Sequence, residues 1–273
     1  MNPDDNDKFI DIDEVIRSKN PKLYRLLPSI IIRYLKKIAH QDELNQAINN
    51  HKNKDGLPFV SGVLSDMGIS YESFGTENIP THGRFIFASN HPLGGLDGLV
   101  IINETGKFFP GIKFVVNDLL LNVKNMNSIF VPVNKHGKQS VEYARRIDEA
   151  YTSENQILYF PAGLCSRNIK GSITDLPWQK NFISKAIKYQ RDIIPVYFSG
   201  QNSSFFYKLA NLRKKLGIKV NIEMLYLVDE MYKQQNKSLK LVFGKPIPHT
   251  LFDSTKPLSD WTLYVRDVVY SMK

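Results

Sequence analysis

The chain has 273 residues, enough for one large α/β domain or two small ones, and its 42% hydrophobic and 23% charged residues are ordinary for a globular protein. A single cysteine, Cys165, excludes an intrachain disulfide framework and fits a reducing compartment. The net charge of +9 suits phospholipid head groups or an acidic carrier protein, whereas nucleic acid is not expected because zinc-finger spacing and an aromatic RNA-binding signature are absent.

The first residues are acidic and polar, unlike a signal peptide. No uncharged apolar run approaches the roughly 18 to 20 residues that cross a bilayer. We therefore expect a cytoplasmic protein, either soluble or attached peripherally to the inner face of the cell membrane.

Residues 9–47 have helical periodicity, and Pro28 is expected to begin a second helix or to kink the first. Apolar and basic side chains fall on opposite sides of this stretch. Either the apolar side packs on the core and the basic side is solvated, or the segment docks on an anionic membrane surface. Five basic residues between positions 22 and 37, at about 1 kcal/mol each near such a surface, would support reversible attachment. The apolar side comprises Leu23, Leu26, Leu27, Ile30, Ile31, Tyr34, Leu35 and Ile38.

Strands and helices alternate through the rest of the chain, which predicts an α/β fold with a mixed central sheet flanked by helices, preceded by an N-terminal helical segment. We expect helices over residues 41–53, 59–67, 96–102, 139–153, 175–189, 205–216 and 258–270. We expect strands over residues 70–73, 85–88, 113–116, 129–133, 156–160, 193–198 and 239–243. Residues 222–231 are apolar but of uncertain type. The expected division is an N-terminal segment, 1–55, and one compact domain, 56–273.

The segment 85–98, FIFASNHPLGGLDG, is an apolar strand followed by a tight turn and the start of a helix. It carries a histidine and an aspartate, His91 and Asp97. A neutral imidazole, with a reference pKa of about 6.5, can take a proton from a hydroxyl, and a carboxylate can fix the imidazole's tautomer. No serine nucleophile is needed if that hydroxyl belongs to the substrate. The alternative is that His91 is a polar residue at a strand end and Asp97 only caps a helix.

Two further polar turns follow apolar strands, over residues 161–167 and 199–203. In open α/β sheets, sites lie where strands run out into loops. The three turns are therefore expected to converge.

The order of these turns resembles the lysophospholipid acyltransferase (PlsC-like) superfamily, which acylates glycerol-3-phosphate and related lyso-lipids. The family's first motif, Asn-His, four residues, Asp, is similar to Asn90-His91 and Asp97, with one residue more between them. Its third motif, Phe-Pro-Glu-Gly-Thr followed by Ser-Arg, resembles residues 160–167. Its fourth motif, a strand ending in Val-Pro, resembles residues 193–196.

The chain is more similar still to a bacterial subfamily labelled hemolysin-like or ornithine- and glycine-lipid acyltransferase, over about residues 10–205. No pore-forming pattern supports the hemolysin label. Ala162 and Leu164 replace the Glu and Thr of the motif that typically holds the acceptor's phosphate. The resemblance therefore implies an acyl transfer to a lyso-amino-acid lipid with a free carboxylate, by an acyltransferase domain over residues 56–273. A lysophosphatidic acid acyltransferase and a non-catalytic protein that binds a membrane or acyl carrier protein are the alternatives.

The implied catalytic residues are His91, as the general base, and Asp97, which orients it. The remaining candidates are expected to contact the substrate. They are Arg167, Ser166 and Lys135 for the acceptor's anionic group, backbone N–H groups of Gly94, Gly95 and Gly163 for the oxyanion, and Asn90 of the first motif.

Neither a metal nor a cofactor is expected, because the six histidines show no paired ligand spacing. The acyl donor would be acyl carrier protein or acyl-coenzyme A, and the basic surface favours the acidic carrier protein. One alternative assigns the nucleophile to Cys165, since Arg167 two residues away would lower the pKa of its thiol. The resemblance argues against this alternative, because the family transfers the acyl group directly.

Overall fold

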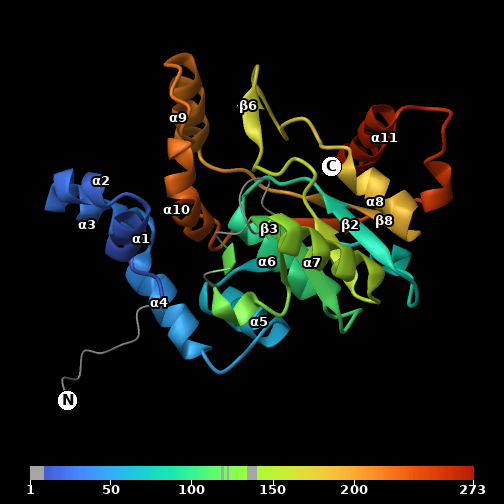
Figure 1. Cartoon of the computed structure of the whole chain (residues 1–273), viewed down its shortest axis with the longest axis horizontal. Coiled ribbons are helices and arrows are strands. Elements are labelled where there is room, and N and C mark those ends of the chain that lie inside the picture. The colour runs from blue at the N-terminus through green and yellow to red at the C-terminus, as the bar shows by residue number, and fades with distance from the viewer. Residues whose placement is uncertain (1–8, 118–119, 122, 134–139) are drawn as a thin grey trace.

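The computed structural model describes residues 9–117, 120–121, 123–133 and 140–273 (Figure 1). Four helices come first: α1 (Ile12–Lys19), α2 (Pro21–Leu26), α3 (Ser29–Ile38) and α4 (Gln41–Asn50). The later helices are α5 (Leu57–Asp66), α6 (Gly95–Thr105), α7 (Ser140–Thr152), α8 (Asn181–Tyr189), α9 (Ser204–Lys215), α10 (Leu227–Tyr232) and α11 (Leu258–Ser271). The strands are β1 (Ser70–Phe74), β2 (Phe85–Ser89), β3 (Ile112–Asn117), β4 (Phe130–Val133), β5 (Gln156–Tyr159), β6 (Arg167–Ile169), β7 (Ser172–Thr174), β8 (Asp192–Phe198) and β9 (Ser238–Phe243).

A seven-stranded sheet with the order β1-β9-β8-β2-β5-β3-β4 forms the centre of the molecule. Its strands pair in parallel except β8 and β9, which are antiparallel, so the predicted mixed sheet is confirmed. Strand β2 lies between β8 and β5, with Phe87 opposite Ile194 on one side and Leu158 on the other. All five residues of β2 are buried, as expected for a strand covered on both faces.

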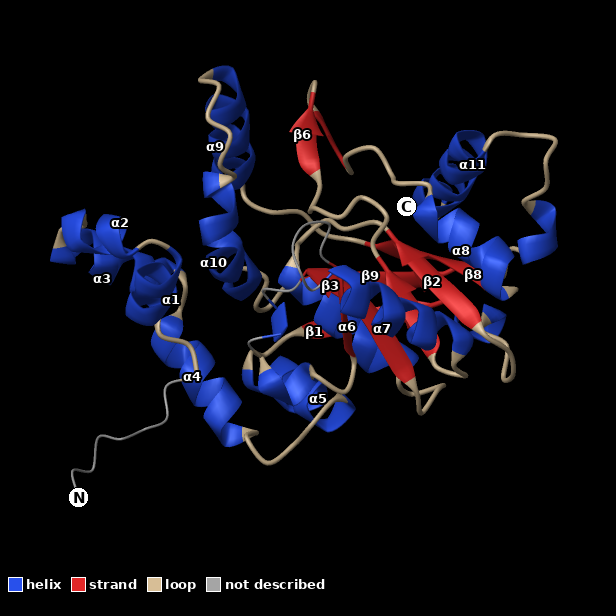
Figure 2. Cartoon of the chain, in the orientation of Figure 1, coloured by secondary structure: helices blue, strands red, loops and turns tan. Residues whose placement is uncertain are grey.

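Helices cover both faces of this sheet, as Figure 2 shows. Successive side chains of β2 point to opposite faces. Phe85 and Phe87 belong to a core with α5 and α6, whereas Ile86 and Ala88 belong to a second core with α7, α8 and α11. The His91 turn therefore leaves the middle of a three-layer α/β/α structure.

The segment between β5 and α8 differs from the prediction. The helix expected over 175–189 begins only at Asn181, and β6 and β7 form an antiparallel hairpin that was not predicted. Leu176 precedes Pro177, and a residue in that position is disfavoured in the α conformation. The hairpin turns at Lys170-Gly171, both with positive φ, as the type I′ two-residue loop requires. Residues 222–231 form a 3₁₀ turn, η4 (Ile222–Tyr226), and most of α10.

The N-terminal helices lie at one side of the molecule, beside α9 and α10 (Figure 1). Pro28 is the residue before α3, which confirms that it begins a new helix. Polar contacts tie this segment to the rest of the chain: the Tyr34 hydroxyl lies 2.9 Å from that of Tyr226, and His40 Nε2 lies 3.1 Å from Asp229 Oδ1.

The apolar side of α2 and α3 is largely exposed. Leu26 is 80% and Ile30 is 66% exposed, and α2 has no buried residue. The interpretation that this side packs on the core holds for the buried Ile38 but is wrong for the exposed side chains. We call these the N-terminal apolar surface; they are Leu23, Leu26, Ile30, Ile31 and Tyr34. In the described ranges, no helix has the length and apolar character to span a bilayer.

Candidate active site

The turn between β2 and α6 folds around the carboxylate of Asp97. Its Oδ2 atom accepts hydrogen bonds from the backbone N–H groups of Leu93, at 3.0 Å, and Gly94, at 3.3 Å, and lies 3.0 Å from His91 Nδ1. Its Oδ1 atom accepts from the N–H of Gly98 at 3.0 Å. Asp97 is fully buried. These backbone hydrogen bonds hold the Asp97 carboxylate in place independently of its contact with the imidazole.

The imidazole of His91 is held on two sides. Asp97 faces Nδ1, and the ring stacks on Phe160 with centroids 4.0 Å apart and an interplanar angle of 16°. A carboxylate can only accept, so Nδ1 carries the proton and the neutral ring presents the lone pair of Nε2 on its opposite edge. The side chain is 15% exposed. His91 is therefore oriented to receive a proton from a group that enters the site.

A second carboxylate, Asp175, forms a hydrogen bond with the backbone of the same turn. Its Oδ1 accepts from the N–H of His91 at 3.2 Å and from the Ser166 hydroxyl at 2.5 Å, and its Oδ2 accepts from Trp178 Nε1 at 2.9 Å. The N–H of Ser166 also donates to the carbonyl of His91 at 2.7 Å. Ser166 and Asp175 thus position His91, and Ser166 makes these contacts instead of standing free for a ligand.

Asn90 joins β2 to β8 beyond the last pair of the strands. Its Nδ2 donates to the carbonyl of Phe198 at 2.9 Å, and its Oδ1 accepts from the N–H of Phe198 at 2.7 Å. The side-chain amide therefore reproduces a backbone pairing and fixes the end of β2. The three polar turns do converge, since Asn202 of the turn after β8 also donates to the carbonyl of Pro92, at 3.3 Å.

Arg167 is buried in contacts with the protein. Its Nη2 lies 3.0 Å from Glu223 Oε1, its Nη1 donates to the carbonyl of Cys165 at 2.7 Å, and its guanidinium carbon lies 5.3 Å from the ring centroid of Phe206. Glu223 is fully buried and also binds Arg213, at 2.8 Å. The sequence predicts that Arg167 holds the acceptor's anionic group, whereas the structure gives its charge a partner in the protein.

The thiol of Cys165 is buried beside Arg167. Burial raises its pKa to about 11, and this effect exceeds the opposite effect of the arginine. Because the thiolate is the nucleophilic form, the geometry does not favour an acyl-accepting Cys165.

The candidate oxyanion donors differ in their partners. The N–H of Gly94 donates to Asp97, and that of Gly163 donates to the carbonyl of Phe160 at 3.0 Å. Gly95 is the first residue of α6, where backbone N–H groups lack partners within the helix. Within the described ranges, Gly95 is thus the candidate whose N–H has no acceptor. Lys135 lies outside the described residues.

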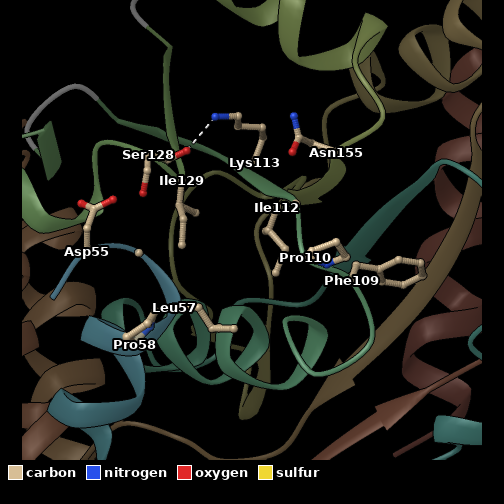
Figure 3. A pocket seen from close by; sticks show the side chains of 12 residues that line it. Asp55, Leu57, Pro58, Phe109, Pro110, Ile112, Lys113, Ser128, Ile129 and Asn155 are labelled. Carbon is tan, nitrogen blue, oxygen red and sulfur yellow. Dashed lines mark hydrogen bonds between the residues drawn. The ribbon is translucent and has the colours of Figure 1, made fainter.

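One cavity lies away from these residues. It has a volume of about 280 Å³ and lies where β3 and β5 begin, next to the start of α5 (Figure 3). Its lysine, Lys113, donates to the carbonyl of Ser128 at 2.6 Å. His91 lies at the opposite, carboxyl edge of the sheet. In the described part of the chain, no three His, Cys, Asp or Glu side chains are grouped as metal ligands.

The chain is similar to known proteins over almost its whole length. A family model described as Acyltransferase matches residues 14–273. The chain is 46% identical over 270 residues to the lyso-glycine lipid O-acyltransferase of Bacteroides thetaiotaomicron, covering 98% of this chain and 99% of that protein. It is 44% identical over 270 residues to the protein of the same name in Phocaeicola vulgatus, covering 98% and 97%. The structure of the 1-acyl-sn-glycerophosphate acyltransferase PlsC of Thermotoga maritima has a TM-score of 0.49 and 17% identity, covering 96% of this chain and 93% of that one.

Proposed function

Because this chain belongs to the acyltransferase family, we propose that it transfers a fatty acyl group from a thioester to the hydroxyl of a lyso-glycine lipid, with His91 as general base. Family membership confirms the resemblance drawn from the motifs. The observation that carries the mechanism is the 3.0 Å contact between His91 Nδ1 and Asp97 Oδ2, which leaves Nε2 to the substrate.

The proposed reaction has two proton transfers through His91. Nε2 takes the proton of the acceptor hydroxyl as its oxygen attacks the thioester carbonyl, and the carbonyl oxygen becomes an oxyanion. The N–H of Gly95, at the positive end of α6, would stabilise that charge. Collapse of the intermediate breaks the carbon–sulfur bond, and the imidazolium returns the proton to the thiolate. The products are the ester and the free thiol, and Asp97 holds the ring throughout.

The acceptor and the donor are tested together. We expect the purified protein to acylate a lyso-glycine lipid at least tenfold faster than lysophosphatidic acid, since Ala162 and Leu164 stand in place of the Glu and Thr typical of phosphate-binding relatives. We propose acyl carrier protein as the donor, because it is acidic and this chain has a net charge of +9. Initial rates with both acceptors and with acyl carrier protein or coenzyme A thioesters measure the two preferences. Faster acylation of lysophosphatidic acid would overturn the assignment of the acceptor.

We propose that the N-terminal apolar surface binds the cytoplasmic face of an anionic membrane. Exposed leucine and isoleucine side chains lie among Lys22, Arg25 and Arg33, and a helix of this composition lies in the interface of a bilayer. Attachment there would bring a protein without a described spanning helix to its lipid acceptor.

Leu26→Asp should weaken binding to vesicles that contain phosphatidylglycerol by at least about tenfold, because an inserted leucine contributes roughly 1.5–3 kcal/mol and a charge opposes insertion. Co-sedimentation measures the bound fraction. The matched control is Leu263→Asp, which changes an exposed leucine (54%) of α11 at the far side of the molecule. Equal binding by the two variants would exclude this surface as the membrane contact.

A further inference from the structure

A small polar pocket beside the candidate active site is lined by residues of the β6–β7 hairpin, of α9 and of the turn before α9. Its volume is about 160 Å³. The side chains that line it are mainly amides and hydroxyls, with one lysine. They are Asn168, Ile173, Gln201, Asn202, Ser204, Tyr207, Lys208 and Asn211.

Asn202 lines this pocket, and one of its buried side-chain atoms has no hydrogen-bond partner among the described residues. The residue is 4% exposed, and its Nδ2 donates to the carbonyl of Pro92. Because a carbonyl can only accept, this contact fixes the orientation of the amide. Within the described residues, its Oδ1 atom is buried and has no hydrogen-bond donor. An unpaired buried acceptor lowers the stability of the fold unless a ligand supplies an N–H or O–H group to it.

The other polar groups of the pocket suit an anion. The Tyr207 hydroxyl accepts from the N–H of Asn202 at 3.0 Å, which leaves its own proton to donate, and burial raises the pKa of Tyr207 to about 12. Lys208 is exposed and forms no salt bridge with any described residue. Glu230, which accepts from Ser203 at the start of α9, is itself paired with Lys233 at 2.9 Å.

We propose that this pocket binds the acceptor's head group as an N-acylated glycine. Lys208 and the Tyr207 hydroxyl hold the carboxylate, and Asn202 Oδ1 accepts the amide N–H. A glycine linked instead through its carboxyl group would present a cationic amine, which Lys208 repels. The inference rests on the proposed function and names the site that selects its substrate.

The place of the pocket fits a lipid whose hydroxyl reacts at His91. Asn202 is bonded to Pro92, the residue after His91, and Asn168 follows the segment in which Ser166 is bonded to His91. On the same face of α9 as Lys208, Phe205 and Leu212 are 49% and 53% exposed and offer an apolar path for the fatty chain. In this arrangement Arg167 and Glu223 hold together β6 and α9, the elements that flank the pocket. Lys208 supplies the positive charge that binds the ligand's carboxylate.

The test compares Lys208→Gln with Lys215→Gln, a change of an exposed lysine on the same helix that does not line the pocket. Acylation is measured with an N-(hydroxyacyl)glycine and with its methyl ester, which keeps the amide N–H but lacks the negative charge. We expect Lys208→Gln to raise the KM for the acid about tenfold with little change in kcat, and to abolish the preference for the acid over the ester. Lys215→Gln should behave as wild type.

An unchanged KM and an unchanged preference in Lys208→Gln, in an assay where wild type acylates the acid, would overturn the pocket and leave the proposed function intact. A wild-type protein that acylates neither glycine compound would instead overturn the proposed function, and the head-group site with it. Asn202→Asp gives a second readout. Its negative charge would lie beside the amide N–H, one methylene from the ligand's carboxylate, and it should raise the KM for the acid more than that for the ester.

Discussion

Replacing His91 with alanine is expected to slow acyl transfer by about 10²- to 10⁴-fold, because general base catalysis contributes that much to a reaction at a hydroxyl. Alanine removes Nε2, so the acceptor oxygen must attack with its proton still bound. The acceptor's KM should change little, since the proposed head-group pocket is formed by other residues. Steady-state rates with purified His91→Ala and wild-type protein measure the effect.

The chain offers a matched control for this variant. His249 Nδ1 lies 2.8 Å from Asp192 Oδ1, so another histidine–aspartate pair exists where β8 begins, away from the carboxyl edge. His249→Ala should retain wild-type turnover. A His91→Ala protein that is folded by circular dichroism and as active as His249→Ala would refute the role of His91 as the base.

The second large effect is expected for Asp97→Asn, a loss of about 10²- to 10⁴-fold in kcat. All the groups around the Asp97 carboxylate are donors: three backbone N–H groups and His91 Nδ1. An asparagine must turn its own NH₂ group toward one of them. If that group faces His91, the ring adopts the other tautomer, and Nε2 carries a proton when the hydroxyl arrives.

Asp192→Asn is the control for this change, because it alters the carboxylate of the His249–Asp192 pair. The free energy of unfolding, measured with urea, separates a lost orientation of His91 from a lost fold. A variant whose kcat falls while unfolding stays close to wild type would support the orienting role. Full activity in a folded Asp97→Asn protein would contradict it.

The His91 turn was predictable because its parts are close in sequence. His91 and Asp97 are six positions apart, and a strand, a glycine turn and a helix N-terminus are all visible in one segment. The alternation of apolar strands and helices likewise predicted the mixed α/β sheet. By contrast, the β6–β7 hairpin was missed because its turn, Lys170-Gly171, lacks the usual Asn-Gly or Asp-Gly signal.

Residues that contact the site but lie far from it in sequence could not be predicted from local sequence patterns. Asp175 lies 84 positions from His91, Glu223 lies 56 positions from Arg167, and Asn202 lies 110 positions from Pro92. An isolated acidic or amide residue in a loop is ordinary, and only the packing of β8, α9 and η4 shows its partner. The charge of Arg167 is evident from the sequence, and the anionic site was therefore assigned to it. Its pairing with Glu223 is visible only in the structure.

The buried thiol of Cys165 makes the molecule convenient for spectroscopy. It is the one cysteine of the sequence and is 1% exposed, so thiol reagents should spare it in the folded protein. A cysteine introduced at Leu26 would therefore be labelled selectively without first removing the native one. A spin label or an environment-sensitive dye at that position would report the depth of the N-terminal helices in a bilayer while the enzyme stays intact.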